Sequence, residues 1–300
     1  MDMGHQHNHA HNHATDNIKV AFFLNLSFTI VEFIGGFYTN SLAIMSDAVH
    51  DLGDSLSLGM SWYFQKLSNK KANKYFSYGY GRFSLLGAII NSVVLLMGSI
   101  FIIKEAIPRI ITPEVSDAKG MMWFAILGII VNGVAVLKLK KGTSINERVV
   151  SLHLLEDVLG WVAVFIASVV MQFWELPILD PILSVLIAGY ILYNVFRNIK
   201  ESFKIILQAV PNQLISNDIA KVLLAFDEIE NVHDCHLWTL DGTLHIATIH
   251  ISVHESIVSW EKAKLLKLKI RKILRDQFQI GHITLELEAS LEDCTYKDCN

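Results

Sequence analysis

Two histidine–aspartate pairs lie in stretches that otherwise have the composition of membrane-spanning helices. His50 and Asp54 are four residues apart, and His153 and Asp157 repeat the spacing about a hundred residues later. Residues four apart in a helix share one face, about 40° apart and one turn from each other. Ionisable side chains are costly in hydrocarbon unless they line a polar cavity, pair with each other or hold an ion. The pairs therefore indicate a functional site.

Brought together, the two pairs would offer two imidazole nitrogens and two carboxylates. This donor set suits tetrahedral Zn²⁺, and it suits calcium or magnesium poorly because those ions prefer oxygen ligands. We therefore predict a zinc site made by two helices, with His50, Asp54, His153 and Asp157 as ligands. The alternative is a hydrogen-bonded polar network that only joins the helices. Asp47 lies on the same face of the first helix, and Asp47 and Asp51 are weaker candidates for the ion pathway.

The composition is that of a membrane protein. The chain has 300 residues, of which 52% are hydrophobic and 18% charged, and its mean hydropathy is +0.39. A soluble globular chain rarely has these values. The net charge of −4, without a basic stripe, argues against a nucleic-acid partner. Three cysteines without a disulfide-framework spacing are typical of reduced, cytoplasmic thiols.

Hydropathy predicts six membrane-spanning helices between residues 18 and 204. Two early spans are interrupted by acidic residues, the first by Glu32 and the second by the aspartates around His50. Gly35 and Gly36, with the residues up to Asn40, are expected to form the turn between these two helices. Four later runs are cleaner, at 83–103, 120–137, 158–174 and 181–196.

Basic residues in short loops predict the orientation, because such loops face the cytoplasm. The loops after the second and fourth spans are rich in lysine and arginine, at Lys66, Lys70, Lys71, Lys74, Arg82, Lys138, Lys140, Lys141 and Arg148. Both termini are therefore expected in the cytoplasm. No cleavable signal peptide is visible, and the short loops favour a bacterial inner membrane.

The two ends of the chain differ from the spans. Residues 1–17 are predicted to be a disordered histidine-rich tail that captures metal weakly, the alternatives being a tag or a low-complexity segment without function. Its histidines are His5, His7, His9, His11 and His13. Residues 205–290 predict a small α+β, ferredoxin-like domain in the order α-β-β-α-β, with elements at 214–226, 236–240, 244–253, 259–278 and 283–288. A tail at 291–300 carries Cys294 and Cys299, which are weaker candidates as zinc ligands.

From about residue 18 to residue 290, the chain resembles the cation diffusion facilitator family of zinc transporters. The motifs that carry the resemblance are Glu32-Phe-Ile-Gly-Gly36, Ser41-Leu-Ala-Ile-Met-Ser-Asp-Ala48, Ser77-Tyr-Gly-Tyr-Gly-Arg82, Asp180-Pro-Ile-Leu183 and Val232-His-Asp-Cys-His-Leu-Trp-Thr239. The resemblance implies a homodimer of six-helix protomers, each with a cytoplasmic domain, that exchanges cytoplasmic metal for protons. Trp161 departs from the family pattern, since a small residue is common there.

The resemblance also assigns residues. His50 and Asp54 match the family's second-helix ligands, and His153 and Asp157 match its fifth-helix ligands. In the cytoplasmic domain it points to regulatory zinc ligands at His233 and His250, with Glu288 where an acidic ligand is often found. These histidines could instead be surface residues of a strand.

We therefore expect a secondary transporter, not an enzyme, that exports Zn²⁺, with Cd²⁺ or Co²⁺ as further ions, in exchange for protons by alternating access. An intramembrane metalloenzyme would need an open coordination position and a general base, and no H-E-x-x-H motif is present. A membrane-anchored metal sensor is the other alternative. That hypothesis does not explain why both histidine–aspartate pairs lie within spans.

Overall fold

The computed structural model describes residues 9–68, 70, 72–139, 145–211, 216–254 and 259–289. Within these ranges it leaves out the side chains of residues 9–21, 61, 62, 65, 66, 68, 138, 139, 145–153, 216 and 217. The chain divides into two compact units. The first comprises Met1–Leu67 and Leu86–Ile199, and the second comprises Ser68–Leu85 and Lys200–Asn300.

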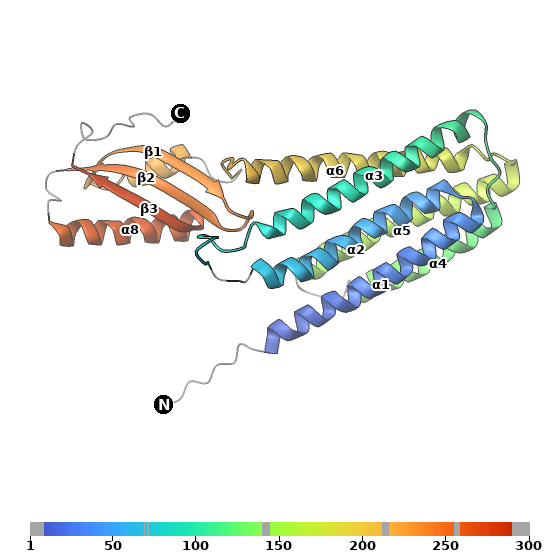
Figure 1. Cartoon of the computed structure of the whole chain (residues 1–300), viewed down its shortest axis with the longest axis horizontal. Helices are drawn as coiled ribbons and strands as arrows, with labels where there is room; N and C mark the ends of the chain where they lie inside the picture. The colour runs from blue at the N-terminus through green and yellow to red at the C-terminus, as the bar shows by residue number, and fades with distance from the viewer. Residues whose placement is uncertain are drawn as a thin grey trace. The chain divides into compact units, whose positions relative to one another are not determined.

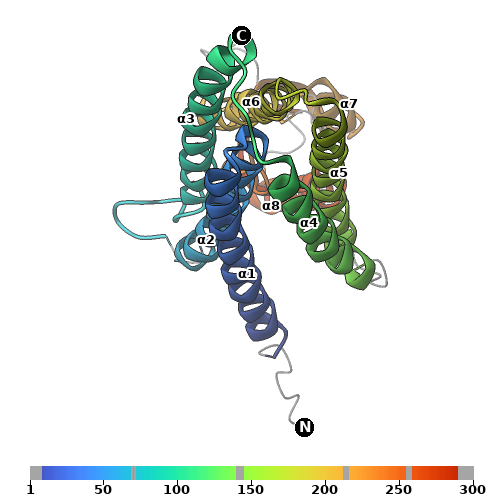
Figure 2. The same ribbon diagram turned by 90° about the vertical axis from the view of Figure 1, so that its right-hand side faces the viewer.

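Six long helices run side by side and make up most of the first unit (Figures 1 and 2). They are α1 (His9–Thr39), α2 (Leu42–Ser68), α3 (Phe83–Ile111), α4 (Ala118–Leu139), α5 (Ile145–Trp174) and α6 (Leu179–Ile206). Judged on their described residues, five of them, all but α2, are long and apolar enough to cross a membrane. The 27-residue α2 is as long as the others, but its aspartates interrupt the apolar composition.

Two details of the first helices differ from the sequence-based expectation. Helix α1 begins at His9, so residues 9–17, expected to be part of a disordered tail, continue the first helix, while residues 1–8 lie outside the described ranges. Gly35 and Gly36 lie inside α1 rather than in the turn. A side chain at Gly35 would collide with the ring of Phe124 in α4, so this glycine allows close helix packing. The turn itself is made at Asn40, whose φ is 53°.

Asp180, at the start of α6, caps the start of α2. Its carboxylate is fully buried and accepts hydrogen bonds from Ser41 Oγ at 2.5 Å, Leu42 N at 2.8 Å and Ala43 N at 3.1 Å. Ser116 Oγ lies 3.4 Å from its second oxygen. The first backbone N–H groups of a helix have no partner within the helix, and here another helix provides the acceptor.

The second unit has the predicted order α-β-β-α-β. Its elements are α7 (Ser216–Leu223), β1 (Ile229–Thr239), β2 (His245–Val253), α8 (Trp260–Phe278) and β3 (Ile280–Glu288). The sheet order is β1-β2-β3, with β1 antiparallel to β2 and β2 parallel to β3. Strand β1 begins at Ile229, earlier than the predicted start at residue 236.

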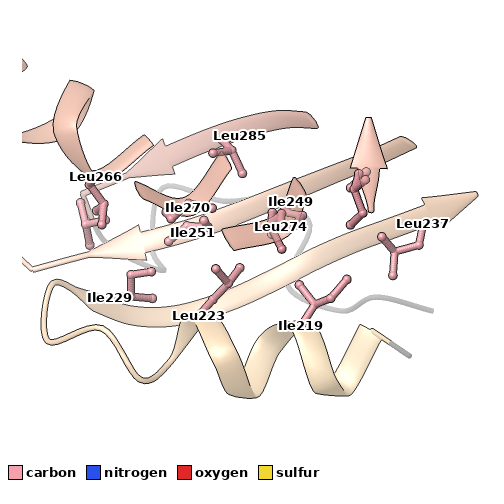
Figure 3. Close-up of a cluster of buried hydrophobic side chains, with 13 residues drawn as sticks. Ile219, Leu223, Ile229, Leu237, Ile249, Ile251, Leu266, Ile270, Leu274 and Leu285 are labelled. Atoms are coloured by element: carbon pink, nitrogen blue, oxygen red, sulfur yellow. The ribbon is translucent and has the colours of Figure 1, made fainter. Parts of the chain in front are cut away.

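The core of this unit lies between the sheet and its helices (Figure 3). Leu266, Ile270 and Leu274 repeat every four residues along α8 and are almost fully buried against the strands. Ile219 and Leu223 of α7 belong to the same cluster. Residues four apart share one helix face, which explains why a helix with many lysines still packs on the sheet.

Asp241 closes the hairpin between β1 and β2. Its Oδ1 accepts hydrogen bonds from Thr243 N at 2.9 Å, Thr243 Oγ1 at 2.8 Å and Leu244 N at 2.8 Å. Partial burial raises the pKa of this carboxyl group, but the hydrogen bonds outweigh burial and leave the pKa lowered. Arg82 Nε donates to the carbonyl of Leu240 beside this turn at 3.3 Å.

Candidate metal centres

Helices α2 and α5 bring three of the predicted zinc ligands together. His50 Nε2 lies 3.7 Å from Asp54 Oδ2 and 3.7 Å from Asp157 Oδ1. One ligand atom from each residue lies within 4.8 Å of the other two. The spacing of four residues places His50 and Asp54 on one face of α2, and that face is turned toward α5.

Burial and hydrogen bonding at this group are suited to a cation. The side chains of His50, Asp54 and Asp157 are 22%, 28% and 8% exposed. Asp157 Oδ1 is buried, and its neighbour His50 Nε2 lies 3.7 Å away, beyond the usual length of a hydrogen bond. A buried carboxylate oxygen without a short hydrogen bond is costly, and a metal ion would satisfy it. The fourth predicted ligand, His153, lies one turn before Asp157 in α5, and its side chain is outside the described part of the chain.

Neighbouring helices hold α2 and α5 in place around the site. Asn25 Nδ2 of α1 donates to the backbone oxygen of Asp51 and to Ser55 Oγ, both at 3.0 Å. Trp161, one turn after Asp157, is fully buried and packs against Gly128 of α4. The large residue at 161 is therefore accommodated by a glycine on the facing helix.

The first two helices carry further buried carboxylates near this group. Asp47 and Asp51 are 5% and 4% exposed, so they do not face water as carboxylates at a helix end would. Glu32 of α1 is 0% exposed. Sequence reasoning noted Glu32 only as an interruption of the first span. The available signal was that Glu32 is the only charged residue in Phe22–Thr39.

A second group lies in the sheet of the other unit. His233 of β1 and His250 of β2 are paired in the sheet register, and their ring centroids are 5.7 Å apart. Glu288 of β3 contacts both, with Oε2 at 3.1 Å from His233 Nε2 and Oε1 at 2.7 Å from His250 Nδ1. The three predicted regulatory ligands therefore form one group within 4.8 Å.

The donor set of this second group fits zinc. His233 and Glu288 have side chains only 4% and 10% exposed. Among the described residues, Nδ1 of His233 has no hydrogen-bond partner, and Nε2 of His233 faces Oε2 of Glu288 at 3.1 Å without the geometry of a hydrogen bond. Two imidazoles and a carboxylate, mostly buried, match the ligands that zinc takes in proteins.

Asp234 was missed by sequence reasoning, although it directly follows His233. Its φ is 45°, and the β1–β2 register shifts between His233 and His236. The distorted strand places the Asp234 carboxylate 2.9 Å from His236 Nε2 and 3.5 Å from His250 Nε2. A positive φ at a non-glycine residue is uncommon. The sequence pattern does not reveal this backbone conformation, so it gave no indication that Asp234 lies beside the two histidines.

Other candidates are not part of these groups. Glu286 reaches His250 from the edge at 3.5 Å, and its side chain is 66% exposed. His245, His254 and His282 are absent from the three-residue group found among the described residues. Cys294 and Cys299 lie outside the described ranges, as do the side chains of the N-terminal histidines.

Both units match models of known protein families. Residues 18–207 match the model of the cation efflux transmembrane domain, and residues 211–290 match the model of the cation efflux protein cytoplasmic domain. This chain belongs to the cation efflux family. The resemblance to cation diffusion facilitators is therefore confirmed, together with the fold of apolar helices and a small α+β domain. The cation efflux protein is an integral membrane protein of a transporter family.

Curated relatives cover nearly the whole chain. The cadmium, cobalt and zinc/H⁺-K⁺ antiporter of Bacillus velezensis is 34% identical over 292 residues, which are 96% of this chain and 93% of the relative. The metal cation efflux system protein CzcD of Cupriavidus metallidurans is 31% identical, over 99% of this chain and 93% of its own length. The zinc transporter ZitB of Pectobacterium atrosepticum is 32% identical, over 95% and 89%.

Proposed function

We propose that this cation efflux protein exports Zn²⁺ from the cytoplasm in exchange for protons by alternating access. The observation that carries the proposal is the group of His50, Asp54 and Asp157 between two helices of the membrane unit. The relatives are named as zinc transporters or as antiporters of cadmium, cobalt and zinc, which supports the same class of ion.

The donor set accounts for both the ion and the exchange. Asp54 and Asp157 supply two negative charges that neutralise a divalent cation inside a low-dielectric bundle. A histidine must lose its proton to bind metal, and its ordinary pKa lies near neutral pH. His50, with His153 as the proposed fourth ligand, can therefore hold metal in one state and protons in the other.

The test is metal-driven proton movement in proteoliposomes that contain a pH-sensitive dye. The native protein is compared with Asp157→Ala under gradients of zinc, manganese and magnesium. The control variant is Glu156→Ala, which changes the adjacent, exposed acid of α5. We expect zinc to drive proton flux in the native protein and in Glu156→Ala, and Asp157→Ala to lose at least ten-fold in rate while keeping its helical content. If zinc binds to the native protein but no protons move, the transporter proposal fails and a membrane-anchored sensor replaces it.

The cytoplasmic group is proposed to be a regulatory zinc site. His233, His250 and Glu288 would hold the ion, which would cross-link three strands of the sheet. We further propose that two copies of the chain form a homodimer, that both termini face the cytoplasm, and that the protein resides in the inner membrane of a bacterium. The cytoplasmic-domain match and the bacterial origin of the relatives support these assignments.

A further inference from the structure

Helix α1 carries none of the proposed ligands of the membrane metal site, yet one of its faces contacts both helices that do. Asn25 and Phe28 are three residues apart and therefore neighbours on this face. Asn25 Nδ2 donates to the Asp51 carbonyl and to Ser55 Oγ of α2, both at 3.0 Å. The ring of Phe28 packs edge-on against Trp161 of α5, with the ring centroids 6.2 Å apart. Helix α1 therefore bridges the two halves of the metal site.

Asn25 holds the turn of α2 that joins two of the ligands. Its two acceptors belong to the residues that directly follow His50 and Asp54 in the chain. One acceptor is a backbone carbonyl, so the contact fixes the helix itself and not only a side chain. Sliding or rotating α2 along α1 would leave the amide of Asn25 without acceptors inside an apolar bundle, which is costly.

Phe28 contacts α5 one turn beyond its ligand. Trp161 is 0% exposed and follows Asp157 by four residues, so the indole and the carboxylate lie on the same face of α5. Phe28 packs against the buried cluster that contains Trp161 together with Ile44 of α2. Close-packed side chains transmit displacements, so a shift of α1 at Phe28 would move the part of α5 that carries Asp157.

Close contacts hold α1 itself in place on both sides of this face. A Cβ atom at Gly59 of α2 would lie 3.0 Å from the ring of Phe22, and one at Gly36 would lie 2.6 Å from Met45 Cγ of α2. Helix α1 also lies beside α4, which it meets at Gly35 (Figure 2). Little space remains for α1 to move by itself, so it can act as a rigid spacer.

The separation of the two halves decides which ion fits. His50 Nε2 lies 3.7 Å from both Asp54 Oδ2 and Asp157 Oδ1. Tetrahedral Zn²⁺, with bonds of about 2.0–2.1 Å, holds its ligand atoms about 3.4 Å apart. The two carboxylates repel each other until the ion arrives, so the helices that carry them tend to separate unless they are tied together. A wider site favours a larger ion such as Cd²⁺, because geometry selects among metals that the same ligands bind.

We propose that α1 sets the separation of the two halves of the metal site, and that Asn25 is a positioning residue that favours Zn²⁺ over larger divalent ions. The inference rests on the proposed zinc transport. Asn25 touches no ion and acts only through the turn of α2 between His50 and Asp54. When its hydrogen bonds are lost, α2 is free to shift away from α5. The shift weakens Zn²⁺ binding most, because the smaller ion needs its ligand atoms closer together.

The test compares the two ions in the same proteoliposomes. Initial transport rates are measured against the concentration of Zn²⁺ or Cd²⁺ for the native full-length protein and for Asn25→Leu, which has a similar volume but no donor. We expect KM for Zn²⁺ to rise about five- to ten-fold, KM for Cd²⁺ to change less than about two-fold, and kcat to stay within about two-fold for both ions. A purely structural role would raise both KM values alike or lower both kcat values.

Matched variants separate positioning from general loosening. Asn91 of α3 also donates to a serine of α2, Ser57 Oγ at 2.8 Å, but outside the turn between the ligands, so Asn91→Leu should keep the native ratio of the two KM values. Ser55→Ala removes one of the two acceptors of Asn25 and should give an intermediate ratio. If Asn25→Leu does not fold, Ser55→Ala decides by the same ratio.

Three results would overturn the inference: a native ratio in Asn25→Leu, an equal change for both ions, or the same fall in Asn91→Leu as in Asn25→Leu. If the unmutated protein transports neither ion, the transport proposal has failed instead.

Discussion

At the scale of single residues, the buried carboxylates of the membrane unit differ in how their charge is balanced. Asp180 accepts hydrogen bonds from two backbone amides and from serine hydroxyls, so its surroundings are complete without an ion. Asp157 faces His50, and Glu32 faces the carboxyl group of Asp51, which is another acid. Satisfied carboxylates are expected to be structural, and unsatisfied ones are expected to bind cations. The sequence does not separate these classes, because each is an acid in an apolar run.

Gly128 provides a residue-scale test of the packing behind the metal site. A Cβ atom at this position would collide with the Trp161 ring, so Gly128→Ala must displace a fully buried side chain of α5. Overpacking of this kind costs about 1–3 kcal/mol. We expect a clearly lower midpoint of thermal unfolding in detergent, followed by tryptophan fluorescence.

Gly133, in the same helix, is the control for this change. A methyl group there would meet nothing within 4 Å, so Gly133→Ala should be neutral or slightly stabilising, by about 0.5–1 kcal/mol from helix propensity. Equal melting of the two variants would show that the Gly128–Trp161 contact does not limit packing.

At the scale of elements, the sequence predicted those helices and strands whose local pattern agrees with their final environment. Helices α3 to α6 follow from long apolar runs, and α8 follows from apolar residues spaced by four. The first half of β1 was missed because the strand is irregular at Asp234, which breaks the alternation that identifies a strand. The helical start of α1 was missed because its residues are polar, and polarity alone favours a tail.

The start of α2 depends on α6, and Asp180→Asn tests that dependence. Both oxygens of Asp180 accept hydrogen bonds, whereas an asparagine keeps one acceptor and turns an NH₂ group toward donors. Leaving buried donors unsatisfied costs about 1–3 kcal/mol. We expect a lower thermal midpoint and slower zinc transport, because α2 carries two of the proposed ligands.

Asp117 is the matched acid for this experiment. It is exposed, and one of its oxygens accepts a hydrogen bond from Lys119 N at 3.1 Å at the start of α4. Asparagine and aspartate are almost equivalent as exposed helix caps, so Asp117→Asn should change neither stability nor transport. If Asp180→Asn behaves like Asp117→Asn, the cap between α6 and α2 is not a stabilising contact.

At the scale of the whole molecule, the described residues of each unit include one three-residue group that could hold a metal ion. The two groups could be predicted from the sequence to different degrees. The membrane group follows from two pairs at helical spacing. The cytoplasmic group depends on sheet topology, because antiparallel pairing sets His233 opposite His250 and only the parallel strand β3 brings in Glu288. Spacing along the chain contains no signal for such pairing, which here came from the family resemblance.

Zinc removal should reveal the cytoplasmic site independently of transport. In full-length protein carrying Asp157→Ala, the membrane site is disabled, so any remaining zinc stabilisation should come from His233, His250 and Glu288. A ligand that binds only the folded state stabilises it by about 2.7 kcal/mol at 100 times its Kd. We expect zinc to raise the thermal midpoint of this variant, a chelator to reverse the change, and the added substitution His233→Ala to remove it.

The control adds His254→Ala, an exposed histidine outside the three-residue group, to the same background. This variant should keep the full response to zinc, because His254 is not one of the proposed ligands. If His233→Ala keeps the response while His254→Ala loses it, zinc binds at the exposed end of β2 and the buried group is only a hydrogen-bonded polar network. If neither substitution changes the response, the stabilising ion lies outside the sheet altogether. Loss with His233→Ala alone would place the ion between β1, β2 and β3, where binding would rigidify the three strands together.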